Sequence, residues 1–168
     1  MHEFSLVSVE GEVGAVSVVR TAIEDMEAVE SDIAIRRAFY KEGSNAAANT
    51  FAQGDLVRVQ ITVDYAARAM TGSYVVTDFL PAGLVHVANS ARFGDRAGTA
   101  GWWAHAATEG QRITFYDFNG RFDRTHTYYY YARVVNPGTF KAEGTMVQSV
   151  GTREYMTLGE DITLTILP

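Results

Sequence analysis

The sequence predicts an all-β fold: an antiparallel β-sandwich of about seven to nine strands, with at most one short helix. Short segments alternate apolar and polar side chains with a two-residue period, which is typical of strands with one buried face. Gly, Asn and Pro separate these segments, and no stretch carries a long helical period. A β-barrel is the structural alternative. We favour the sandwich because the strands are uneven in length and irregular connections separate them.

Length and composition indicate one domain that covers residues 1–168. Hydrophobic residues make up 47% of the chain, which is enough for a substantial core. The net charge of −6 argues against a nucleic-acid partner, since such proteins usually carry a basic face. No apolar run reaches membrane-spanning length, so we expect no membrane contact.

The lack of cysteine excludes some chemistry, and the start of the chain indicates a fragment. Cysteine is absent, which excludes disulfides, thiolate metal sites and cysteine nucleophiles. Met1 is followed directly by strand-like sequence, without the basic and apolar regions of a signal peptide. We therefore expect a fragment of a longer polypeptide.

The first third of the chain contains three strand-like segments and one ambiguous segment. Phe4–Val9, Ala15–Arg20 and residues 33–40 are rich in β-branched and alternating residues. Residues 21–31 combine a short helical stripe with helix-favouring Glu and Ala, so helix and loop both stay open.

Residues 54–83 show the clearest strand pattern in the sequence. Residues 56–65 alternate apolar and polar side chains, and residues 74–80 are a second β-rich run. Pro81 has no N–H for a strand ladder, and Gly83 tolerates backbone angles that other residues avoid, so a corner is expected there.

The second half predicts four more strands and one long connection. Residues 86–110 are the longest irregular stretch, and connections of that length are often functional. Strands are expected at 112–118, 125–135, 140–147 and 161–167. Asn119-Gly120 signals either a two-residue hairpin or, given the polar residues beyond it, a longer connection. Gly144 is expected at a bulge or at a close approach of two backbones.

Alternation assigns one set of side chains to the core. This set is Val57, Val59, Ile61, Val63, Val75, Phe79, Ile113, Phe115, Tyr128, Tyr130, Ile162, Leu164 and Ile166.

No motif in the sequence carries catalytic chemistry. The four histidines lack the i+2 or i+4 spacing of a zinc site, and neither a G-x-S-x-G elbow nor a phosphate loop is present. We assign no catalytic residue, metal site or cofactor, and we expect no enzyme.

Four aromatic residues are candidates for an interface. Trp102 and Trp103 are adjacent in the long irregular stretch, and Tyr129 and Tyr131 lie on the strand face opposite the predicted core. Exposed Trp and Tyr often anchor protein interfaces.

Four motifs stand out in the sequence: Gly54–Val59, Asp78–Leu84 (DFLPAGL), Arg112–Tyr116 and Tyr130–Phe140 (YYARVVNPGTF). Together they resemble the C-terminal macroglobulin-like domain of bacterial alpha-2-macroglobulin proteins. The resemblance extends from about Ile33 to the C-terminus, and the last motif is the most specific.

The resemblance implies a non-catalytic β-sandwich at the end of a large exported protease inhibitor. In that family a thioester made from Cys and Gln elsewhere in the polypeptide tethers proteases after they cut a bait region. This chain has no cysteine and would instead dock against the thioester-bearing part. The implied partners are neighbouring domains, with proteases reached through the parent protein. The implied location is extracellular or in the cell envelope, either periplasmic or surface-anchored. A carbohydrate-binding or adhesion module that uses Trp102 and Trp103 stays open as the alternative.

Overall fold

The computed structural model describes residues 32–88, 105–120 and 122–168. This part of the chain contains strands and no helix. The strands are β1 (Ile33–Lys41), β2 (Thr50–Ala52), β3 (Leu56–Tyr65), β4 (Gly72–Phe79), β5 (Leu84–His86), β6 (His105–Glu109), β7 (Arg112–Asn119), β8 (Thr125–Val134), β9 (Gly138–Ala142), β10 (Met146–Ser149), β11 (Met156–Leu158) and β12 (Ile162–Leu167). They outnumber the seven to nine expected, because the short strands β2, β5 and β11 carry too few residues to show a period. The strand predictions for Phe4–Val9 and Ala15–Arg20, and the helix question at 21–31, lie outside the described residues.

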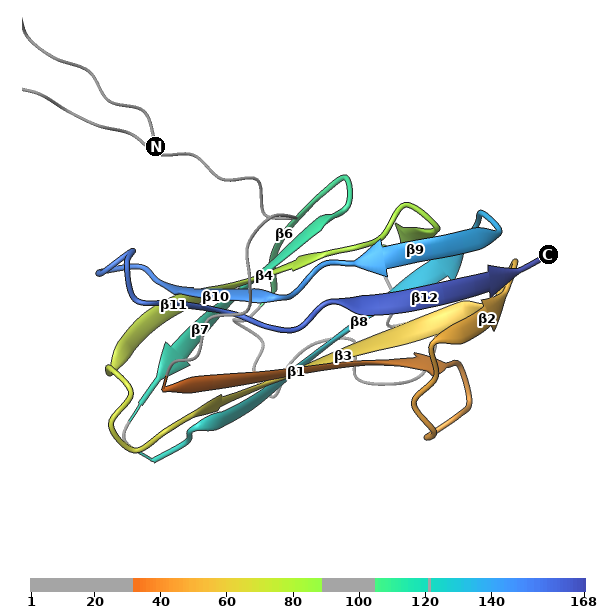
Figure 1. The fold of residues 1–168 in the computed structure, drawn as a ribbon. Helices are drawn as coiled ribbons and strands as arrows, with labels where there is room; N and C mark the ends of the chain where they lie inside the picture. Colours follow the sequence, from red (N-terminus) through yellow and green to blue (C-terminus); the bar gives the residue numbers. More distant parts are fainter. Residues whose placement is uncertain (1–31, 89–104, 121) are drawn as a thin grey trace, which may run out of the picture.

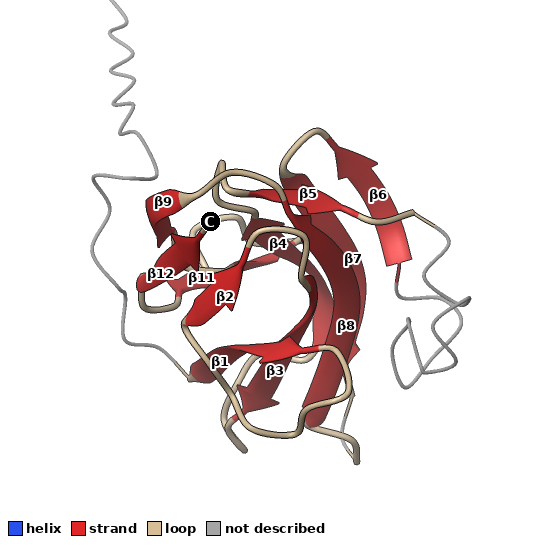
Figure 2. Ribbon diagram, turned by 90° about the vertical axis from the view of Figure 1, so that its right-hand side faces the viewer, coloured by secondary structure: helices blue, strands red, loops and turns tan. Residues whose placement is uncertain are grey.

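The strands form three sheets (Figures 1 and 2). The first sheet has the order β1-β3-β8-β5, the second β11-β10-β4-β7-β6 and the third β2-β12-β9. Every pairing is antiparallel except that of β12 with β2. The predicted all-β, antiparallel sandwich is therefore confirmed.

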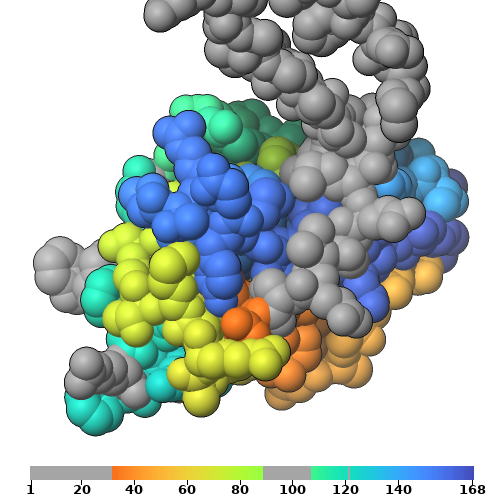
Figure 3. Space-filling model, turned by 60° about the vertical axis from the view of Figure 1, so that its left-hand side comes forward, coloured from red at the N-terminus to blue at the C-terminus, as the bar shows by residue number. Residues whose placement is uncertain are grey.

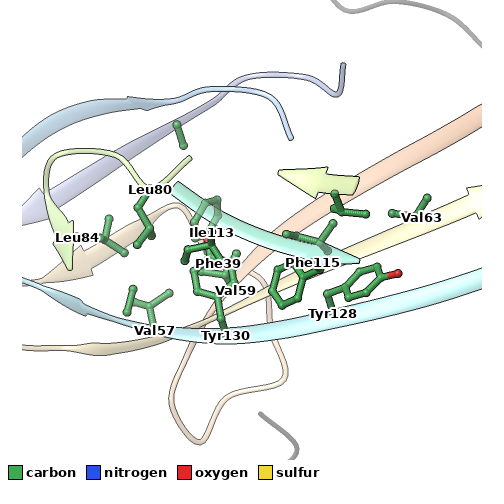
Figure 4. Close-up of a cluster of buried hydrophobic side chains, with 14 of the residues drawn as sticks. Phe39, Val57, Val59, Val63, Leu80, Leu84, Ile113, Phe115, Tyr128 and Tyr130 are labelled. Carbon is green, nitrogen blue, oxygen red and sulfur yellow. The ribbon is translucent and has the colours of Figure 1, made fainter. Parts of the chain in front are cut away.

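The central strand of the first sheet, β3, follows the alternation in the sequence. It pairs with β1 on one side and with β8 on the other, so that Val59 lies between Phe39 and Tyr130. Its inward valines and Ile61 are 0% exposed. Figure 4 shows Val57, Val59 and Val63 in one buried cluster with Ile113 and Phe115 of the second sheet. Burial of this apolar surface between the two sheets is the main force that holds the layers together.

The predicted inward face of β4 is wrong by one residue. Tyr74 and Val76 are 0% exposed, whereas Val75 and Phe79 are only half-buried. The strand places Asp78 inward, where the carboxylate meets a buried arginine. A pattern based on hydrophobicity alone puts a carboxylate outside, and so it selects the wrong face. Ile162 is also only half-buried, although it packs against the core.

The single strand predicted at 140–147 is two strands in two different sheets. β9 belongs to the third sheet and β10 to the second. Gly144 lies at the crossing, where its N–H donates to Asp161 and an added Cβ would lie 2.0 Å from the Gly159 carbonyl oxygen. The predicted close approach of backbone at Gly144 is confirmed, and it explains the break between the strands.

The structure selects the longer β7–β8 connection, one of the two alternatives that the sequence left open, and corrects the reason for glycine at position 83. β7 ends at Asn119 and β8 begins at Thr125 in a different sheet, so the two strands are joined by the longer connection rather than by a two-residue hairpin. At the corner, Gly83 does not adopt a positive φ. A Cβ there would instead lie 2.4 Å from Ile166 and 2.6 Å from Phe140, so the position needs glycine for space.

The β10–β11 hairpin closes one end of the sandwich. In Figure 3 these residues (blue) lie beside the segment that leads into β4 (yellow-green). The Tyr155 ring packs 6.3 Å from that of Tyr74, and its hydroxyl accepts from the Met70 N–H at 3.5 Å.

Candidate functional site

The structure places two of the four predicted interface residues on the outer face of the first sheet. Tyr129 is partly exposed there, and Tyr131 lies on the same face but is only 2% exposed. Trp102 and Trp103 lie outside the described residues. The four residues stay a prediction as an interface.

An aromatic and arginine cluster occupies this outer face. Arg58 of β3 lies opposite Tyr40 of β1, and its guanidinium carbon is 4.8 Å from the centre of the Tyr40 ring and 5.7 Å from that of Tyr129. We call Arg58, Tyr40 and Tyr129 the Arg58 cluster. Attraction between a guanidinium and an aromatic face holds such an arrangement together.

An exposed apolar patch lies on the outer face of the second sheet. Tyr116 and Phe118 of β7 are 56% and 52% exposed. The strand register places Val75 opposite Tyr116, and Val150, which is exposed, follows β10 at the same end of the sheet. We call Tyr116, Phe118, Val75 and Val150 the β7 patch. Large exposed apolar groups that gather on one face mark interaction surfaces.

Sequence reasoning missed the β7 patch, although the alternation along β7 indicates part of it. Ile113 and Phe115 were assigned inward, and strict alternation then turns Tyr116 and Phe118 outward. Only the strand pairing brings Val75 to the same surface.

Among the described residues, two carboxylates are buried in the interior. The Asp78 carboxylate is 2.6 Å from the Arg37 guanidinium, and it accepts from Thr145 Oγ1 at 2.7 Å and from the Tyr130 hydroxyl. Arg37 also donates to the Ala142 carbonyl at 2.8 Å. Burial and the nearby Asp78 charge raise the pKa of Tyr130 well above its usual value, so this phenol stays a donor. The network ties β1, β4 and β8 together.

The second carboxylate, Asp117, joins the two main sheets at the other end. It accepts from the Tyr65 hydroxyl at 2.7 Å and from the Phe118 N–H at 2.7 Å, and it contacts Nδ1 of His126. Burial alone would raise the pKa of Asp117, but hydrogen bonds from His126, Tyr128 and Tyr65 lower it below its usual value.

The His126–Asp117 pair makes stability depend on pH. The hydrogen bond to Asp117 raises the pKa of His126 from 6.5 against the effect of burial, and Asp123, 3.7 Å from Nε2, adds to the rise. Stabilisation by protonated His126 is therefore fully present below pH 6.5 and is lost as pH rises through the raised pKa. The contribution of Asp117 is present above pH 3.8 and is lost as pH falls through its lowered pKa.

We expect the free energy of unfolding to decrease as pH rises from 6 to 9 in the wild type. His126→Gln should show a flatter profile over this range, because glutamine cannot lose a proton. Urea denaturation at several pH values measures the difference. Parallel profiles in the two proteins would contradict the assignment.

The buried carboxylates are structural rather than open to a ligand. Each is at most 3% exposed and is surrounded by donors of the protein itself. In the described ranges no group of three or more His, Asp or Glu side chains could hold a metal ion. Those ranges also contain no helix long and apolar enough to span a bilayer.

The fold is an all-β sandwich of the macroglobulin type. The family model of the bacterial alpha-2-macroglobulin MG10 domain matches residues 33–154, and the chain belongs to this family. The resemblance seen in the sequence motifs is thereby confirmed. No curated protein sequence matches the chain.

Solved structures of bacterial alpha-2-macroglobulins share the fold. Native Escherichia coli alpha-2-macroglobulin from domain MG7 to the C-terminus matches with a TM-score of 0.69 at 20% identity, over 84% of this chain and 24% of that one. The elastase-activated E. coli protein matches with a TM-score of 0.70 at 21% identity, over 84% and 14%. A point mutant of Salmonella alpha-2-macroglobulin matches with a TM-score of 0.67 at 21% identity, over 85% and 10%. This chain thus spans at most about a quarter of each of these alpha-2-macroglobulin chains.

Proposed function

We propose that this domain is a non-catalytic C-terminal module of an alpha-2-macroglobulin-like protease inhibitor. Residues 1–168 form one domain of a longer exported polypeptide in the extracellular space or the cell envelope. The domain docks against the thioester-bearing part of that polypeptide and meets proteases only through it. The family match over residues 33–154 is the observation that carries this proposal.

The β7 patch is the surface best suited to this docking. Tyr116 and Phe118 expose about half of their surface, and among the described residues they pair with β4 alone, because the pairing of β7 with β6 extends only to Phe115. Aromatic side chains of this kind supply much of the binding energy at protein interfaces. Because interdomain interfaces within a chain are of moderate size, such a contact can hold until the parent protein rearranges.

Replacing both aromatic side chains of the β7 patch should weaken this docking and so expose the thioester. In the parent protein, Tyr116→Ser combined with Phe118→Ser is expected to raise the uptake of a labelled primary amine by the thioester before any protease is added. Removal of two hot-spot side chains corresponds to a change of about tenfold or more. Amine incorporation is measured by mass spectrometry of the thioester peptide.

Leu167→Ser is the matched control for this experiment. Leu167 is 50% exposed at the end of β12 in the third sheet, away from both proposed surfaces, so its loss tests a general effect of removing an exposed apolar side chain. The control should take up amine like the wild type. Unchanged uptake in the double variant would refute docking through the β7 patch.

A further inference from the structure

The outer face of the first sheet is basic, although the chain as a whole is acidic. The outward positions of β1, β3 and β8 carry Arg36, Arg58 and Arg133 against one carboxylate, that of Asp64. Their formal sum is 3 − 1 = +2, compared with −6 for the whole chain. A local charge opposite to that of the rest of the molecule favours approach of an acidic surface.

Arg58 is the arginine on this face that lacks a partner for hydrogen bonding. Arg36 pairs with Asp64 at 2.6 Å, and Arg133 donates to the Gly54 carbonyl at 2.8 Å. In contrast, the Arg58 guanidinium has no acceptor within the described part of the chain, and its Nε is buried without a hydrogen bond.

The two carboxylates closest to Arg58 in the sequence, those of Asp55 and Asp64, are both paired with other groups. Asp64 accepts from both Arg36 and Thr125, at 2.6 and 2.7 Å. Asp55 pairs with Lys41 at 2.7 Å and also accepts from a backbone N–H. The stacking on Tyr40 and Tyr129 therefore orients a guanidinium whose charge no described carboxylate neutralises.

We propose that the Arg58 cluster is a docking point for a carboxylate side chain on an acidic segment of a neighbouring domain. This inference rests on the proposed function, because it takes the partner from the same parent polypeptide. A planar guanidinium fixed between two rings presents its donors in the fork geometry that a carboxylate accepts bidentately. Arginine and tyrosine are also among the residues enriched at the centres of protein interfaces.

Titration of the isolated 168-residue chain with an octaglutamate peptide tests the carboxylate site. Wild type should bind the peptide, and Arg58→Gln should weaken the dissociation constant about tenfold or more. Arg36→Gln removes one positive charge from the same face and leaves the stack intact, so it should weaken binding far less. Equal losses in the two variants, or no binding to the wild type, would overturn the proposal.

Carbodiimide cross-linking in the parent protein tests the source of the carboxylate. The amine of an Arg58→Lys variant should couple to an Asp or Glu outside residues 1–168, which peptide mapping identifies. An Arg36→Lys variant should couple to Asp64 within the chain, because that pair is in contact. Coupling of position 58 only within residues 1–168 would refute the assignment. The amine-uptake experiment on the β7 patch is independent of this result.

Discussion

Replacing Arg37 with alanine is expected to lower the free energy of unfolding by about 3–5 kcal/mol, the usual cost of removing one partner of a buried ion pair. The side chains of Arg37 and Asp78 are 3% and 0% exposed. Without the guanidinium, the Asp78 carboxylate keeps hydrogen bonds from Thr145 and Tyr130 but loses its only opposite charge among the described residues. A carboxylate left inside the sandwich without that charge is the main source of the loss.

The adjacent residue provides a matched control. Arg36 also forms an ion pair, but its side chain is 70% exposed and water solvates the charge well. Arg36→Ala should therefore cost less than about 1 kcal/mol. Urea denaturation of the three proteins compares the effects directly. Similar losses in the two variants would show that the Arg37–Asp78 pair is not buried as described.

Phe115→Ala should destabilise the domain by a similar amount, about 3–5 kcal/mol, because it leaves a cavity between the two main sheets. The Phe115 side chain is 1% exposed, and its ring centre lies 5.0 Å from that of Tyr128 and 6.4 Å from that of Tyr130. Figure 4 shows these rings together in the interior. The chain around them can relax only in part, so the lost contacts are not recovered.

Phe118→Ala on the same strand tests whether the effect comes from burial. Phe118 is 52% exposed and faces outward, so its truncation should cost no more than about 1 kcal/mol. Thermal unfolding of both variants measures the contrast. A large loss for Phe118→Ala together with a small loss for Phe115→Ala would mean that the two faces of β7 are interchanged.

Alternation in the sequence was sufficient where apolar groups dominate the inward face of a strand. On β3 the inward residues Val57, Val59, Ile61 and Val63 were predicted, and on β8 so were Tyr128 and Tyr130. The same rule failed on β4, because Asp78 points inward to Arg37, a partner 41 positions earlier in the sequence. A pattern local to one strand does not contain that partner.

The candidate surfaces could be predicted only in part from the sequence. Alternation indicated that Tyr129 faces away from the core, but the Arg58 cluster depends on the register between β1, β3 and β8. Likewise, the β7 patch depends on the pairing of β4 with β7. Strand register follows from packing across the whole sandwich, so no single segment of the sequence determines it.

Hydroxyl-radical footprinting of Tyr116 and Phe118 tests the central claim most directly. We expect both rings to be labelled readily in the isolated chain and to be protected in the intact parent protein. After a protease cuts the bait region, the labelling should return toward that of the isolated chain. Equal labelling in the isolated chain and in the intact parent would contradict the claim that this domain works by docking through its β7 patch.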